Sequence, residues 1–175
     1  MNNMSDRGSN CICRLLPEGR DLQLGELEDL VDEVAGRPEL WREQVRHERD
    51  RRFYTRLHRD PHVDVWLICW DAKQETGLHD HDRSAGAVRV VEGTLLEDWL
   101  APHGRSLSLE TRAHRAGDRF SFDASYIHDV RHDGGPPAVS LHAYSPALWR
   151  MGYYAVGRNG LGRVSLTYLE DEAAA

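Results

Sequence analysis

Apolar positions in the first third of the chain recur at intervals of three and four residues. This helical spacing predicts an amphipathic helix over residues 22–35, with Gly36 and Pro38 as its stop signals. The residues of its apolar face are Leu24, Leu27, Leu30, Val31 and Val34. A second, highly charged helix is expected over residues 39–52, on a thin apolar face of Leu40, Trp41 and Val45.

From Phe53 onward the pattern changes to short runs of β-branched and aromatic residues separated by turn signals. We expect strands over residues 63–70, 87–92, 94–100, 107–114, 119–122, 127–132, 139–144, 153–156 and 164–169. Many short strands at regular spacing are typical of an all-β sandwich or small barrel. The chain should therefore hold a poorly ordered N-terminus over residues 1–18 and a single domain over residues 19–175, with an all-β core behind two N-terminal helices.

Composition narrows the function classes. The chain has 175 residues, 40% hydrophobic and 29% charged, which suits one globular domain. Its net charge of -7 argues against nucleic-acid partners and against an anionic membrane surface. No apolar run approaches the ~20 residues that span a bilayer, and residues 1–10 lack the apolar core of a secretory signal. We expect a cytoplasmic protein, either monomeric or a weak homo-oligomer, with Cys11, Cys13 and Cys69 as reduced thiols.

Two histidines, His79 and His81, are the first candidate metal ligands. Side chains at positions i and i+2 of a strand point to the same face, so both imidazoles could reach one ion. Such pairs also occur on protein surfaces without a metal, and the pair alone is weak evidence.

The surrounding spacing resembles the two histidine motifs of the cupin superfamily. His79 and His81 are followed by Gly86 and Gly93, and the second motif is matched by Gly117, Asp123, Ser125, His128 and His132. The resemblance implies a small β-barrel, or jelly roll, with His79, His81 and His128 as metal ligands. Gly86 stands where many cupins carry an acidic ligand. His132 and His142 remain rival third ligands, and Asp82 remains a possible carboxylate ligand.

Three neutral imidazoles would leave a divalent ion with its full charge and with open positions. Either zinc or iron accepts such a site. The uncompensated charge favours an anionic ligand, and a substrate thiolate is one.

A second group of polar residues, Ser140, His142 and Tyr144, shares one face of the strand expected over residues 139–144. These side chains either form a buried hydrogen-bonded row or lie on a solvated face.

Together these segments resemble the cysteine dioxygenase family of thiol dioxygenases. The matching residues, in chain order, are Tyr54-Thr55-Arg56, Cys69-Trp70, His79-Asp80-His81, His128 and the Ser140-x-His142-x-Tyr144-Ser145-Pro146 segment. The resemblance implies Fe(II) on the three histidines, with Arg56 on the substrate carboxylate and Tyr54 as an added contact; a surface charge is the alternative for Arg56. It places the Tyr144 hydroxyl near substrate and O2, oriented by His142 and Ser140, with Trp70 packed beside the iron site.

Two further features follow from the resemblance. The Ser145–Pro146 peptide bond is expected to be cis. Gly86 occupies the place of the cysteine that forms a thioether with the active-site tyrosine in the mammalian enzymes, so Tyr144 should be unmodified.

The resemblance implies oxidation of L-cysteine by O2 to cysteine sulfinic acid. Three alternatives remain open: dioxygenation of 3-mercaptopropionate or another small thiol, a non-catalytic metal-binding cupin, and a zinc or nickel cupin that acts as an isomerase or hydrolase.

Overall fold

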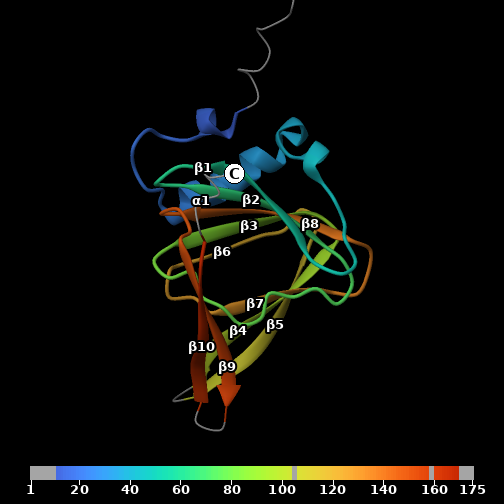
Figure 1. The fold of residues 1–175 in the computed structure, drawn as a ribbon, viewed down its shortest axis with the longest axis vertical. Helices are drawn as coiled ribbons and strands as arrows, with labels where there is room; N and C mark the ends of the chain where they lie inside the picture. The colour runs from blue at the N-terminus through green and yellow to red at the C-terminus, as the bar shows by residue number, and fades with distance from the viewer. Residues whose placement is uncertain (1–10, 104–105, 158–159, 170–175) are drawn as a thin grey trace, which may run out of the picture.

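The computed structural model describes residues 11–103, 106–157 and 160–169 (Figure 1). Its elements are η1 (Ile12–Leu15), α1 (Leu24–Ala35), η2 (Pro38–Leu40), η3 (Arg42–Gln44), β1 (Phe53–Arg59), β2 (Asp64–Trp70), β3 (Ala85–Glu92), β4 (Thr94–His103), β5 (Ser106–Arg115), β6 (Arg119–Phe122), β7 (His128–His132), β8 (Ala138–Ser145), β9 (Arg150–Gly157) and β10 (Gly160–Tyr168), where η denotes a 3-10 helix.

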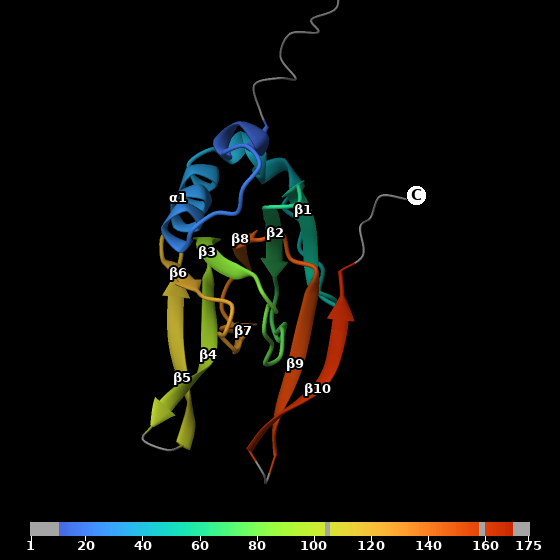
Figure 2. The same cartoon turned by 90° about the vertical axis from the view of Figure 1, so that its left-hand side faces the viewer.

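The strands form two layers, as expected for a cupin, but they do not close into one continuous barrel. One layer is a five-stranded sheet in the order β1-β2-β8-β3-β6. The other contains the sheet β5-β4-β7 and the hairpin β10-β9, which lie on opposite sides of the lower layer in Figure 2. His79 joins them, because its backbone forms bridges to both His128 of β7 and Tyr153 of β9.

Helix α1 covers the outer face of the five-stranded sheet (Figure 2). Leu27, Leu30, Val31 and Val34 are buried there, as the apolar spacing predicts, whereas Leu24 is exposed. Strands β2 and β8 alternate between the two faces. Their outer residues belong to the same buried cluster as the helix, while Trp70 and Tyr144 face the inner core between the layers. These outer residues are Val65, Leu67, Cys69, Val139, Leu141 and Ala143.

The second predicted helix, over residues 39–52, is wrong. The chain forms η2 and η3 there and then runs without regular structure to β1. Trp41, at φ -143°, interrupts the two turns and is buried, with its indole N–H donating to the carbonyl of Val34 at 3.1 Å. Only Leu40 and Val45 are partly buried beside this tryptophan, and three apolar residues do not make the stripe that a longer helix needs. No helix among the described residues is long and apolar enough to cross a membrane.

The sequence pattern located nine of the ten described strands, with ends that differ by a few residues. It missed β1, in which polar and charged side chains separate Phe53, Thr55 and Leu57 on one face. Strand β1 pairs with β2 along its whole length, with a register shift between Arg56 and His58. Pairing to a well-formed neighbour therefore stabilises a strand whose own pattern is weak.

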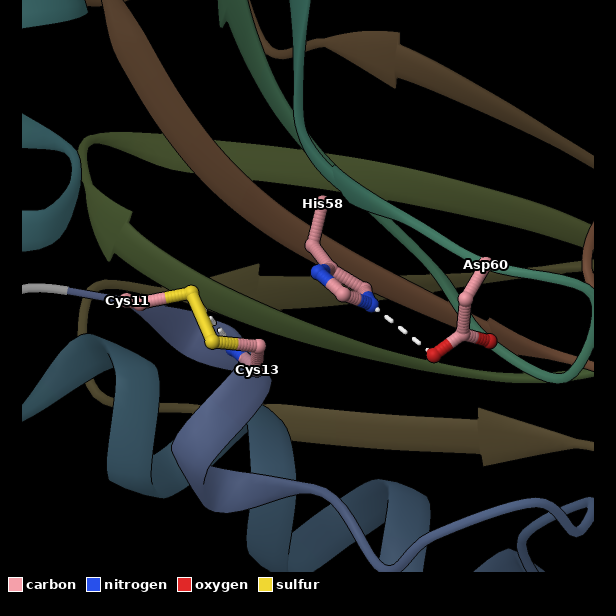
Figure 3. Close-up of a disulfide and its surroundings, with 4 residues drawn as sticks. All are labelled: Cys11, Cys13, His58 and Asp60. Atoms are coloured by element: carbon pink, nitrogen blue, oxygen red, sulfur yellow. Dashed lines mark hydrogen bonds and ion pairs between the residues drawn. A yellow bond between two sulfur atoms is a disulfide. The ribbon is translucent and has the colours of Figure 1, made fainter.

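The N-terminal segment joins the domain ahead of the boundary expected at residue 19. Ile12 of η1 is buried in the same core as α1, while residues 1–10 lie outside the described part of the chain. Cys11 and Cys13 form a disulfide at the start of η1, near His58 of β1 and its partner Asp60 (Figure 3). The expectation of reduced thiols is thus wrong for this pair: the turn brings their Cα atoms to 5.2 Å, a spacing that a disulfide bridges. Cys69 is a buried free thiol.

Candidate metal centre and its cavity

Three buried histidines converge in the inner core. His79 lies directly opposite His128, because the two residues exchange backbone hydrogen bonds of 2.8 and 3.1 Å. His81 follows two positions after His79, so its side chain points the same way. One ring nitrogen from each of the three lies within 4.8 Å of the others. The structure therefore brings together the three histidines that the cupin resemblance implies as ligands.

The ring nitrogens have a pattern of hydrogen bonds that suits a metal. His79 Nδ1 lies 2.8 Å from the carbonyl of Gly77, which can only accept, so Nδ1 carries the proton and Nε2 keeps its lone pair. His128 Nδ1 lies 2.9 Å from Glu97 Oε1, with the same result. Both ring nitrogens of His81 are buried without a hydrogen-bond partner among the described residues. An unpartnered buried imidazole is costly unless a ligand satisfies it, and a divalent ion would do so.

Burial also keeps His79 and His81 neutral. It lowers the pKa of His79 to about 3 and the pKa of His81 well below its usual range, and the neighbouring histidines act in the same direction. Neutral imidazole is the form that binds a metal.

Glu97 of β4 is a partner of the centre that sequence reasoning missed. It is 1% exposed and accepts hydrogen bonds from His128 Nδ1 and His114 Nε2, each at 2.9 Å. Burial opposes its ionisation, but these two hydrogen bonds hold the pKa of Glu97 at about 2. A buried carboxylate therefore fixes the tautomer and the orientation of His128. The available signal was an acid at an inward strand position, two residues after the buried Leu95.

The rival ligands do not join the centre. Asp82 pairs with Arg150 and accepts from the indole of Trp149 at 2.8 Å. Both ring nitrogens of His132 are engaged locally, by Pro136 and Gly134. The neighbouring Asp80 turns away to β9, where it accepts from the backbone of Gly152.

His142, the remaining rival, belongs to a hydrogen-bonded row. Ser140 Oγ lies 2.8 Å from His142 Nε2, and His142 Nδ1 lies 3.2 Å from the Tyr144 hydroxyl. Trp70 extends the row, because its indole N–H, which can only donate, lies 2.8 Å from Ser140 Oγ. With Ser140 donating to Nε2, His142 donates from Nδ1 and the phenolic proton of Tyr144 is left for the cavity. The Ser145–Pro146 peptide bond that follows is cis, as the resemblance implied.

The space above Gly86 is filled by an aromatic ring. A Cβ at Gly86 would lie 2.4 Å from the Phe122 ring and 3.1 Å from the Tyr144 ring. Phe122 stacks on His81 with ring centroids 4.6 Å apart, and Tyr144 stacks on the same imidazole at 5.1 Å. Packing around His81 thus holds Tyr144 in place where Gly86 offers no side chain.

A cavity of about 180 Å³ opens onto this centre. Its wall includes His79 and His128 of the centre, and His142 and Tyr144 of the row. It is smaller than the ~300–1,000 Å³ of pockets for drug-sized ligands, which favours a small molecule. Burial raises the pKa of the Tyr144 phenol, so its proton is retained at neutral pH.

The polar wall of the cavity differs from the sequence expectation. Tyr54 lines it, as expected, and so do Tyr153 and Arg52, which sequence reasoning missed. Arg56 does not line it: its Nε lies 3.1 Å from the buried Asp64 Oδ1. Arg52 lay in the predicted second helix, and no spacing motif points to it.

A two-layered β fold of this kind, with three inward histidines on a small cavity, defines a cupin with a candidate metal centre. Two solved structures share the fold. The protein TT1209 of Thermus thermophilus superposes with a TM-score of 0.53 at 17% identity, over 61% of this chain and 93% of that one. A double-stranded β-helix protein of Klebsiella pneumoniae gives 0.50 at 17% identity, over 60% and 80%.

The chain belongs to the family described as cysteine dioxygenase type I, whose sequence profile it matches over residues 12–155. Among curated relatives, it is 27% identical over 139 residues to cysteine dioxygenase type 1 of Danio rerio, which covers 71% of this chain and 66% of that protein. It is 24% identical over 139 residues to the Homo sapiens protein, over 73% and 68%. The aligned region thus spans about two thirds of the relatives' length.

Proposed function

We propose that this protein is an Fe(II)-dependent thiol dioxygenase that oxidises L-cysteine with O2 to cysteine sulfinic acid. The observation that carries the proposal is a small cavity that reaches two of the three gathered histidines, the His142–Tyr144 pair and a guanidinium group. Membership of the cysteine dioxygenase type I family supports the substrate, because its curated members carry that name.

The reaction needs no further co-substrate. Conversion of a thiol to a sulfinic acid removes four electrons from sulfur, and reduction of both atoms of O2 accepts four. Both oxygen atoms then end on sulfur. Fe(II) held by His79, His81 and His128 would supply the activation of O2.

The residues of this chain would bind and orient the reactants. Three neutral ligands leave the centre with a charge of +2, which favours an anionic thiolate over the neutral thiol. Tyr144 would present a retained phenolic proton to the cavity, with its hydroxyl oxygen held by His142 Nδ1. Ser140 and Trp70 would fix the tautomer of His142 behind it. Positioning of this kind replaces the search for a productive orientation in solution.

The test is turnover of the Fe(II)-loaded protein with L-cysteine in air, followed by oxygen electrode and by mass spectrometry of the product. We expect one O2 to be consumed per cysteine, with cysteine sulfinic acid as the product. 3-Mercaptopropionate, assayed in parallel, should give a lower kcat/KM. A protein that consumes no O2 with either thiol would contradict the proposal.

A matched pair of variants on β7 separates metal binding from general damage. His128→Asn removes a candidate ligand, whereas His132→Asn changes a buried histidine of the same strand whose nitrogens bond only to Pro136 and Gly134 among the described residues. We expect bound iron and turnover to disappear in the first variant and to persist in the second. Equal loss in both variants would refute the ligand assignment.

A further inference from the structure

The disulfide between Cys11 and Cys13 takes no part in the proposed function. It lies at the surface, because Cys13 is exposed and Cys11 is partly exposed. Ile12, between them, is 4% exposed and belongs to the same core cluster as α1. The buried isoleucine therefore anchors this turn and holds the disulfide outside the core. A thiolate can attack such a disulfide, since the rate of thiol–disulfide exchange depends on access to the sulfur atoms.

The two sulfur atoms differ in their surroundings. The backbone N–H of Cys13 donates to the Sγ atom of Cys11 at 3.2 Å. This bond favours negative charge on Cys11, because a hydrogen bond to the charged form of a group stabilises that form. Cys13 is the more exposed of the two residues. An incoming thiolate is therefore expected to attack the sulfur of Cys13 and to release Cys11, since a stabilised thiolate leaves faster.

A histidine and a carboxylate lie beside the disulfide (Figure 3). His58 belongs to β1, against which η1 packs, and its Nε2 lies 3.1 Å from Asp60 Oδ2. The other oxygen of Asp60 accepts from the backbone N–H groups of His62 and Val63 at 2.7 and 2.8 Å, which fixes the carboxylate. A carboxylate accepts, so Nε2 of His58 donates. In the neutral ring, Nδ1 is then the nitrogen that can take a proton from an incoming thiol.

This arrangement of sulfur, imidazole and carboxylate is the one that activates thiols for nucleophilic attack. Small thiols are the reagents that suit it, because they reach an exposed sulfur atom and become nucleophilic when they lose a proton. The thiol substrate of the proposed function is such a reagent, and it would be present wherever the enzyme acts.

We propose that Cys11 and Cys13 form a thiol–disulfide exchange site that accepts electrons from small thiols. In the first step a small thiolate bonds to the sulfur of Cys13, the bond between Cys11 and Cys13 breaks, and Cys11 leaves as a thiolate. In the second step another small thiolate attacks the sulfur of the first one and releases Cys13.

Two small thiols are thereby oxidised to one small disulfide, and the protein disulfide takes up the two electrons. The two protons that the small thiols lose end on Cys11 and Cys13. The exchange goes beyond the dioxygenase activity and does not depend on it.

The test is peptide mass spectrometry of the full-length, metal-loaded protein after incubation with L-cysteine without oxygen, which prevents dioxygenation. Samples quenched with acid locate the mixed disulfide, and parallel samples are alkylated in the folded state to detect free thiols. We expect L-cysteine to appear first on Cys13, and both Cys11 and Cys13 to become free thiols later. Cys69, a buried free thiol, should not be alkylated and serves as the internal control for folding.

The role of His58 is tested by the rate of exchange. We expect His58→Gln to exchange about 10-fold more slowly, less than the ~100-fold or more of a fully positioned base, because thiols ionise in part without help. Asp60→Asn keeps an acceptor for the backbone but removes the charge, and it should slow the exchange in the same direction. His47→Gln changes an exposed histidine between η3 and β1 and is the matched control, with the wild-type rate expected.

Three results would overturn the proposal. The first is a disulfide that L-cysteine leaves intact in the folded protein but reduces in the chain unfolded by urea. The second is a mixed disulfide that forms on Cys11 before Cys13, which would reverse the assigned roles. The third is an exchange rate of His58→Gln equal to that of His47→Gln and wild type.

Discussion

Replacement of Glu97 by glutamine tests whether a carboxylate behind the centre controls metal binding. Glu97→Gln keeps the shape of the side chain but removes its charge and exchanges one acceptor oxygen for an NH2 donor. In the structure both oxygens accept, one from His128 and one from His114, each at 2.9 Å. An amide can satisfy only one of these two donors.

The expected loss of metal affinity follows from the number of hydrogen bonds that the amide can no longer accept. One charge-assisted hydrogen bond, worth about 1.5–3 kcal/mol, is lost, and the ring that loses it leaves a donor unpaired in the core. If the loss falls on His128, its tautomer and orientation are no longer fixed. We therefore expect metal affinity to fall by about 10–100-fold, or ~1.4–2.7 kcal/mol, as for other partners of ligand histidines.

The assay is competition between the apoprotein and a chromophoric chelator, with Zn(II) in air and Fe(II) without oxygen. Asp98→Asn provides the control, because Asp98 is the next residue of β4, is 8% exposed, and accepts from Arg131 at 2.8 Å on the other face of the strand. It should lose stability without losing metal affinity. Metal binding by Glu97→Gln within twofold of wild type would refute the reasoning, and so would an equal loss of affinity in Asp98→Asn.

Three further predictions follow from packing and burial. Gly86→Ala should lower Tm, because its Cβ would meet the Phe122 ring at 2.4 Å, at a cost of about 1–3 kcal/mol. The control is Gly162→Ala, whose Cβ has nothing within 4 Å and should change Tm little. Equal changes in Tm for the two variants would count against the contact with Phe122. His81→Leu should abolish metal binding but raise the Tm of the metal-free protein, since it removes two buried nitrogens without hydrogen-bond partners. A lower Tm of the metal-free variant would show that the imidazole nitrogens have hydrogen-bond partners in the metal-free protein. Burial holds the pKa of His142 at about 3, below the 6.5 of an unfolded histidine, so the unfolded state binds more protons between these values and stability falls as pH drops below 6.5. In His142→Gln this fall should be shallower by up to ~1.4 kcal/mol per pH unit in chemical denaturation, and an unchanged slope would contradict the assignment.

Local sequence patterns predicted most of the fold because the side chains of each core strand alternate between its two faces. The two faces of β8 are an example: Leu141 and Ala143 pack under α1, while the polar residues between them face the inner core. The helix expected over residues 39–52 does not form because its apolar face of Leu40, Trp41 and Val45 is too thin to support more than two short 3-10 turns. Strand β1, which follows this segment, forms because it pairs with β2, and a short stretch of sequence does not reveal that pairing.

The residues of the candidate site also divide into those that a local motif reveals and those that depend on contacts between distant segments. His79, His81 and His128 were predictable because their spacing is local to two hairpins, and the structure brings them together. Glu97 was not predictable, since its approach to His128 depends on the register between β4 and β7. Arg52 was missed because the burial of Asp64 beside Arg56, which leaves Arg52 as the cation of the cavity, is a property of packing alone.

The central claim is that this cavity joins both atoms of O2 to the sulfur of cysteine. The most direct measurement is mass spectrometry of the product formed by the Fe(II)-loaded protein from L-cysteine under 18O2 in unlabelled water. The account predicts cysteine sulfinic acid with two 18O atoms. Product that carries one label or none, or the absence of sulfinic acid while the iron is bound, would contradict it.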